Sequence, residues 1–128
     1  ENSSAFGASS AATGANSTAS GYDSEAQGAS SAAYGDSAMA AADYSVAVGA
    51  QSLVTNANAT AIGVGTEADG VSSFAGGDSA LAEADYSVAV GAVAVATSAA
   101  GTSVAVRSFF WVPDAPSECV ALKKFCPS

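Results

Sequence analysis

The carboxylates are the candidates for general acid–base catalysis in this chain, which contains no histidine. Its suggestive carboxylates are one close pair, Glu67 and Asp69, and turn aspartates that recur 42 residues apart, Asp36 with Asp78 and Asp43 with Asp85. A glycosidase would need two such groups to face each other across a cleft, one with a raised pKa. A Ser-His-Asp triad and a histidine-ligated metal are both excluded.

The turn aspartates could bind a metal, but a purely structural role in the turns is the preferred interpretation. The Gly-Gly-x-Gly-x-Asp pattern of calcium-binding β-rolls is absent. Asp is a common turn residue because it bonds the local backbone, so we expect these side chains to be solvated. The sequence therefore predicts no enzyme activity, no metal site and no cofactor.

The charge of the chain is strongly one-sided. Twelve acidic residues face three basic ones, and the net charge is −9. The basic residues all stand near the end, at Arg107, Lys123 and Lys124. Nucleic acids and anionic membranes recruit Lys and Arg, so neither is expected as a partner. No apolar run reaches 18 residues, and we expect this segment not to insert into a membrane.

A seven-residue repeat of the form Ser-x-Ala-x-Gly-x-x organises most of the sequence. Fifteen heptads run without insertion over residues 3–107, with Ala two residues before the glycine position in all but two of them. Ten of the glycines fall at multiples of seven, namely Gly7, Gly14, Gly21, Gly28, Gly35, Gly49, Gly63, Gly70, Gly77 and Gly91.

The repeat predicts strands and excludes two familiar heptad or glycine structures. A coiled coil needs large apolar residues twice per heptad, whereas the constant positions here are small. Glycine in a helix interior costs about 1 kcal/mol each time, and collagen requires a period of three. In a strand, Ser, Ala and Gly share one face, and the glycine with the two residues after it forms the turn. We therefore expect a thin roll with an alanine-lined interior.

The outward positions of alternate heptads differ, which predicts a fourteen-residue coil. We count the heptad of residues 3–9 as the first and call the outward side chains of odd-numbered heptads the odd face and those of even-numbered heptads the even face. The odd face has no charge in sixteen positions, whereas the even face has four charges in fourteen. Seven and a half coils of about 4.8 Å would give a rod of about 36 Å.

The odd face is predicted to be an interface between identical chains. Its apolar members form a continuous stripe of Phe6, Tyr34, Val46, Val48, Ile62, Phe74, Val88, Val90 and Val104. Such stripes usually mark interfaces, and cyclic symmetry lets each chain offer the same surface. Ligand contacts are then expected on the even face, at Glu25, Gln27, Leu53, Glu67, Asp69, Leu81 and Glu83. The residues themselves do not fix the number of chains.

The segment Ser-Val-Ala-Val-Gly-Ala at 45–50 and 87–92, with the Ser-x-Ala-x-Gly units around it, resembles the YadA-like head repeat of trimeric autotransporter adhesins. The resemblance covers residues 3–107. It implies a left-handed parallel β-roll, three chains packed side by side, and attachment to host matrix proteins or cells, or self-aggregation, at the bacterial surface after export through the outer membrane. An inert fibre segment is the alternative. Ice binding is disfavoured because threonines align only every third coil.

Residues 108–128 depart from the repeat. They are aromatic, contain three prolines, and show neither a neck motif nor a coiled-coil stalk. We expect a head domain over 1–107 and a non-repetitive cap or tail over 108–128. Cys119 and Cys126 are the only cysteines and could form a local disulfide or remain free thiols. Glu1 opens directly into the repeat, as in a processed or excised piece.

Overall fold

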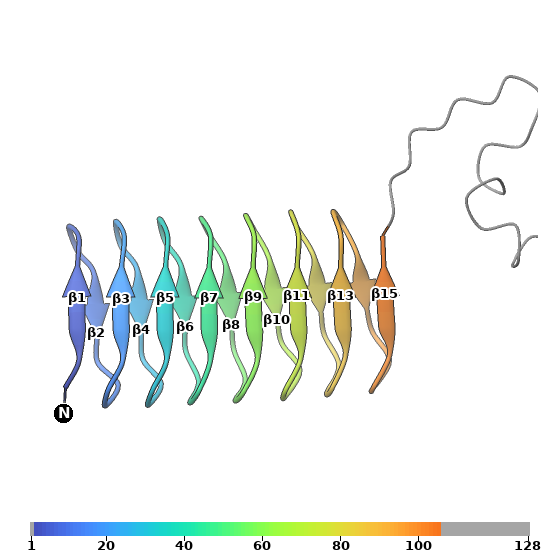
Figure 1. Ribbon diagram of the computed structural model, residues 1–128, viewed down its shortest axis with the longest axis horizontal. Helices are drawn as coiled ribbons and strands as arrows, with labels where there is room; N and C mark the ends of the chain where they lie inside the picture. The colour runs from blue at the N-terminus through green and yellow to red at the C-terminus, as the bar shows by residue number, and fades with distance from the viewer. Residues whose placement is uncertain (1, 106–128) are drawn as a thin grey trace, which may run out of the picture.

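The computed structural model describes residues 2–105, and these form a parallel β-solenoid (Figure 1). The predicted all-β fold and its fourteen-residue coil are confirmed, because each strand pairs in parallel with the strand fourteen residues away, as in Ala33 with Ala47. The described residues include no helix long and apolar enough to cross a membrane. The predicted tail, its cysteines and Arg107 lie outside the described part.

Two sheets lie back to back along the rod, as the front and rear rows of arrows in Figure 1 show. The odd heptads form an eight-stranded sheet of β1 (Ser4–Phe6), β3 (Thr18–Ser20), β5 (Ala32–Tyr34), β7 (Val46–Val48), β9 (Thr60–Ile62), β11 (Phe74–Gly76), β13 (Val88–Val90) and β15 (Thr102–Val104). The even heptads form a seven-stranded sheet of β2 (Ala11–Ala12), β4 (Glu25–Ala26), β6 (Met39–Ala40), β8 (Leu53–Val54), β10 (Glu67–Ala68), β12 (Leu81–Ala82) and β14 (Val95–Ala96).

The interior consists of stacked small side chains, as the repeat predicts. The Ala position of the heptad is fully buried in the middle coils, for example at Ala33, Ala47 and Ala61, and Val54 is its one large member. Serines of the first heptad position are buried beside them, and several donate their hydroxyl to the carbonyl three residues earlier, as Ser52 does to Gly49 at 2.9 Å. The core is therefore thin, and its polar atoms are largely satisfied by the turns.

The turns distinguish odd from even heptads more sharply than expected. Glycine adopts a positive φ after the odd strands, at Gly7, Gly21, Gly35, Gly49, Gly63, Gly77 and Gly91. The glycine position after even strands has no positive φ, which is why Ala42 and Ala84 can occupy it. The heptad glycine therefore supplies a positive φ in only half of the described turns.

The last heptad residue adopts a left-handed φ in every described turn, and thirteen of these residues are not glycine. Tyr44 and Tyr86, both at φ 58°, are the bulkiest. From Asp23 onward, each such residue donates its backbone N–H to a carbonyl one coil earlier, as Tyr86 does to Val71 at 2.8 Å. Stacking of the coils therefore holds a conformation that these residue types rarely adopt alone.

Candidate binding and assembly surfaces

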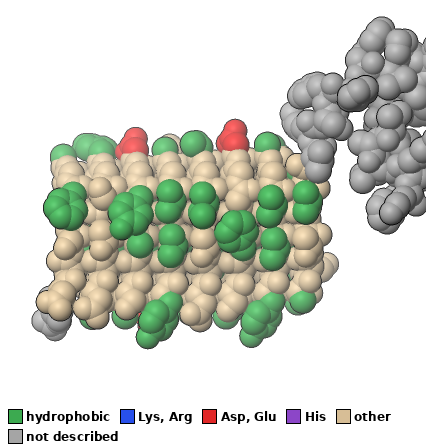
Figure 2. Space-filling model, viewed as in Figure 1, with side chains coloured by type: hydrophobic (Ala, Val, Ile, Leu, Met, Phe, Trp, Pro, Cys, Tyr) green, Lys and Arg blue, Asp and Glu red, His purple; other side chains and the backbone are tan. Residues whose placement is uncertain are grey.

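The odd face is uncharged over its whole length and mostly apolar. All nine residues of the predicted stripe lie at outward positions of the eight-stranded sheet, and Figure 2 shows hydrophobic side chains spread over this face, with acidic groups only at the rim. Val46, Val48 and Val88 are half-buried, and the other six are exposed, from 36% at Phe74 to 64% at Phe6. The stripe is open in the single chain and is interrupted at β3, where the outward residues are Thr18 and Ser20.

The even face carries the predicted ligand-facing residues but gathers them into no cleft. Gln27 and Glu83 are exposed, and the other five are half-buried along the seven-stranded sheet. Glu67, Asp69 and Glu83 lie on two neighbouring coils, whereas Glu25 lies three coils away, since 42 residues separate it from Glu67. The arrangement is a flat, acidic strip.

The surroundings of Glu67 alter the proton affinity of its carboxyl group. Burial raises the pKa of Glu67, and the charge of Asp69, a hydrogen bond with Asp69 and the charge of Glu83 raise the pKa further. Asp69 also accepts a hydrogen bond from Thr55 at 2.7 Å. No group of three or more potential metal ligands occurs among residues 2–105.

Two of the turn aspartates accept hydrogen bonds from the backbone of the preceding coil, and the sequence did not reveal these bonds between coils. Asp43 accepts a hydrogen bond from the N–H of Ala29 at 2.8 Å, and Asp85 accepts one from Val71 at 2.9 Å. Both bonds join a turn to the coil before it. Asp36 instead accepts from the neighbouring hydroxyl of Ser37 at 3.1 Å.

Exposed tyrosines at the turns are the surface feature that the sequence interpretation missed. Tyr22, Tyr44 and Tyr86 are 63%, 62% and 64% exposed. The sequence did contain a signal for two of them, because Asp-Tyr recurs in segments 35–50 and 77–92, which are duplicates that differ at two of sixteen positions.

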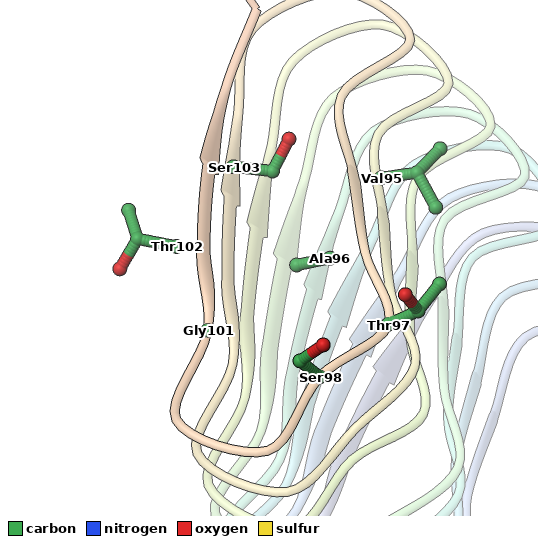
Figure 3. A pocket seen from close by; sticks show the side chains of 7 residues that line it. All are labelled: Val95, Ala96, Thr97, Ser98, Gly101, Thr102 and Ser103. Carbon is green, nitrogen blue, oxygen red and sulfur yellow. The ribbon is translucent and has the colours of Figure 1, made fainter.

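A hollow of about 190 Å³ lies at the end of the roll, where the last coil turns from β14 into β15. Figure 3 shows Ala96, Ser98 and Ser103 directed into the space between the two layers, while Val95 and Thr102 point away from it. No titratable side chain lines this hollow. It is the open end of the solenoid, where another coil would stack.

Comparison with known proteins agrees with this geometry. The profile of the YadA head domain repeat (2 copies) matches residues 1–24, 26–52, 55–80 and 68–94. No curated protein sequence gives a significant match. Among solved structures, the collagen-binding domain of the Yersinia adhesin YadA is similar, with 33% identity and a TM-score of 0.74 over 84% of this chain.

The chain spans 60% of the length of that solved domain. The matched repeats account for the Ser-x-Ala-x-Gly units and for the parallel coils into which they fold. The chain therefore belongs to the YadA head family, a family of non-enzymatic adhesin heads.

Proposed function

We propose that this chain is the head of a trimeric surface adhesin and that it attaches bacteria to host extracellular matrix, with collagen as the first candidate ligand. The observation that carries the proposal is the separation of charge in a chain that is similar to a collagen-binding domain. All nine carboxylates of residues 2–105 lie on the even face or in turns, and none lies on the strands of the odd face. Assembly through the odd face leaves the acidic surfaces free for a ligand.

Three parallel copies would cover the apolar stripe without bringing carboxylates together. Burying an unpaired charge is costly, so an interface of an acidic chain is expected where charge is absent. The left-handed coil, the location on the bacterial surface and the head boundary at residue 107 belong to the same proposal. They are supported by membership in the family and by the extent of the repeat.

Collagen is the first candidate ligand because the similar Yersinia domain binds collagen. The ligand surface would be the even face with its turns, since the odd face is used in assembly. Repeated weak contacts on three chains would then give binding through avidity. Self-aggregation and attachment to other matrix proteins use the same exposed surface.

The test is binding of the intact assembled protein to immobilised collagen, fibronectin, laminin and epithelial cells. We expect saturable binding to collagen by the assembled form. A folded, assembled protein that binds none of the four surfaces would instead support the alternative, an inert segment of a trimeric fibre.

A further inference from the structure

The odd face consists of two columns of side chains that differ in chemistry. The first strand residues form one column, which we call the flank: Ser4, Thr18, Ala32, Val46, Thr60, Phe74, Val88 and Thr102. The third strand residues form the other, which we call the ridge: Phe6, Ser20, Tyr34, Val48, Ile62, Gly76, Val90 and Val104. Four of the eight flank residues carry a hydroxyl on a small side chain, whereas Ser20 alone does in the ridge.

On three strands the ridge side chain is more exposed than the flank side chain, whereas on β7 both are half-buried and on β11 the order is reversed. On the same strand, Tyr34, Ile62 and Val90 are exposed at 42%, 43% and 39%, while their flank neighbours are half-buried. On these strands, the large apolar side chains of the ridge are therefore the outermost groups of the odd face. The line of ridge side chains is where a facing chain would first make contact.

Gly76 would leave a gap in this line, but a flank side chain fills it. A Cβ atom built on Gly76 would lie 2.8 Å from Cε1 and 3.2 Å from Cζ of Phe74, so the phenyl ring covers the glycine. Gly76 needs no glycine for its backbone, because its φ is not positive.

The equivalent strand three coils earlier carries an aromatic ring from the other column. Forty-two residues earlier, strand β5 reads Ala32–Ala33–Tyr34, whereas β11 reads Phe74–Ala75–Gly76. The aromatic residue has changed its backbone position, yet a ring covers the ridge in both coils. This compensation indicates that the ridge is kept apolar more strictly than the flank, with Ser20 on β3 as its polar exception.

We propose that the ridge is the line along which copies of this chain contact one another, and that Phe74 completes it over Gly76. The inference rests on the proposed assembly and narrows the predicted stripe, because Val46 and Val88 become flanking residues. A second copy is the partner that fits. Residues 2–105 carry only acidic charges, so two copies avoid repulsion best along their uncharged line. Parallel in-register copies also set each ridge side chain beside its own equivalent.

Two substitutions on strand β7 separate the ridge from the flank. We expect Val48→Asp to raise the concentration of half-assembly at least about tenfold, measured by sedimentation equilibrium, because an unpaired charge would be buried. Val46→Asp should change it far less, since a flank side chain keeps access to water. Equal effects of the two substitutions would overturn the ridge proposal. Circular dichroism identifies a variant that has simply lost its strands.

A second experiment depends on an apolar loss and its rescue. Phe74→Ala should weaken assembly several-fold, whereas Val88→Ala, in the same column, should weaken it much less. The double variant Phe74→Ala with Gly76→Tyr restores the arrangement of β5 and should recover assembly. Failure of this rescue in a folded protein, or a Phe74→Ala variant that assembles normally, would overturn the ridge proposal while leaving the trimer intact. An unsubstituted chain that stays monomeric would contradict the trimer as well.

Discussion

At the scale of single residues, the altered proton affinity of Glu67 has a direct consequence for stability. The pKa of this carboxyl is raised in the folded state by burial first and by its acidic neighbours second. A raised carboxyl pKa means that the folded state binds the proton more tightly than the unfolded chain. Ionised Glu67 therefore destabilises the fold above its folded pKa, and the cost disappears as pH falls below the ordinary value.

We expect Glu67→Gln to give a small rise in melting temperature at pH 7 and no rise near pH 4. The chain offers a control in Glu25, which lies 42 residues before Glu67 at the same position of its heptad. There, Gln27 stands in place of the second carboxylate. Glu25→Gln removes the Glu25 carboxylate and serves as the matched control. Thermal melts of both variants from pH 4 to pH 8 check this, and a rise at pH 4 equal to that at pH 7 would remove the electrostatic cause.

The turn aspartates permit a second prediction at this scale. Asp85→Ala removes the acceptor of the Val71 N–H and should cost about 1 kcal/mol per chain. Asp78→Ala loses only a bond from the neighbouring Ser79 hydroxyl and should be nearly neutral. Denaturant unfolding compares the two, and indistinguishable losses would mean that water replaces the Asp85 carboxylate without penalty.

Some properties of single residues could not be predicted from the sequence. The left-handed φ of Tyr44, Val93 and Ala100 could not be predicted, because none of these types favours it. Contacts with the preceding coil impose it. The ring of Phe74 over Gly76 depends on a side-chain rotamer and was likewise hidden.

At the scale of the elements, most of the architecture was predictable. The charge difference between odd and even heptads indicated a fourteen-residue coil, and Thr18 does pair with Ala32. The expected strands were longer than those found, because the serine and glycine ends of each heptad enter the turns. A second signal was overlooked: glycine is replaced only after even heptads up to residue 98, where no positive φ is needed.

The alanine interior sets a limit on side-chain size. Ala47 is fully buried between Ala33 and Ala61 in neighbouring coils, so Ala47→Leu would overpack the space between the sheets. We expect a loss of about 1–3 kcal/mol per chain. Val46→Leu, which adds volume on the outer surface, should cost much less. Comparable losses in denaturant unfolding would contradict an interior that is closed to large side chains.

At the scale of the whole molecule, the acidic surface should govern ligand binding. Changing Glu67 and Asp69 to Lys should weaken attachment to a basic partner, and higher salt should weaken binding of the unchanged protein. Collagen-coated surfaces at low and high salt provide the measurement. Binding that survives both treatments would remove the acidic strip from the mechanism and direct attention to the aromatic segment 109–112.

The surfaces themselves could be assigned to faces from the sequence, but their use could not. The stripe from Phe6 to Val104 lies on one sheet, as the heptad count predicted. What covers it depends on a partner that one chain does not contain. The roles of the even face and of residues 108–128 depend in the same way on surroundings beyond the single roll.

The most direct test of the account is the mass of the full chain in solution by sedimentation equilibrium at micromolar concentration. The odd face is uncharged and apolar along the rod, and the account requires that identical chains cover it. We expect a species of three times the 12.2 kDa chain mass. A folded monomer over the whole concentration range would contradict the assembly, and with it the assignment of the acidic face to ligand binding.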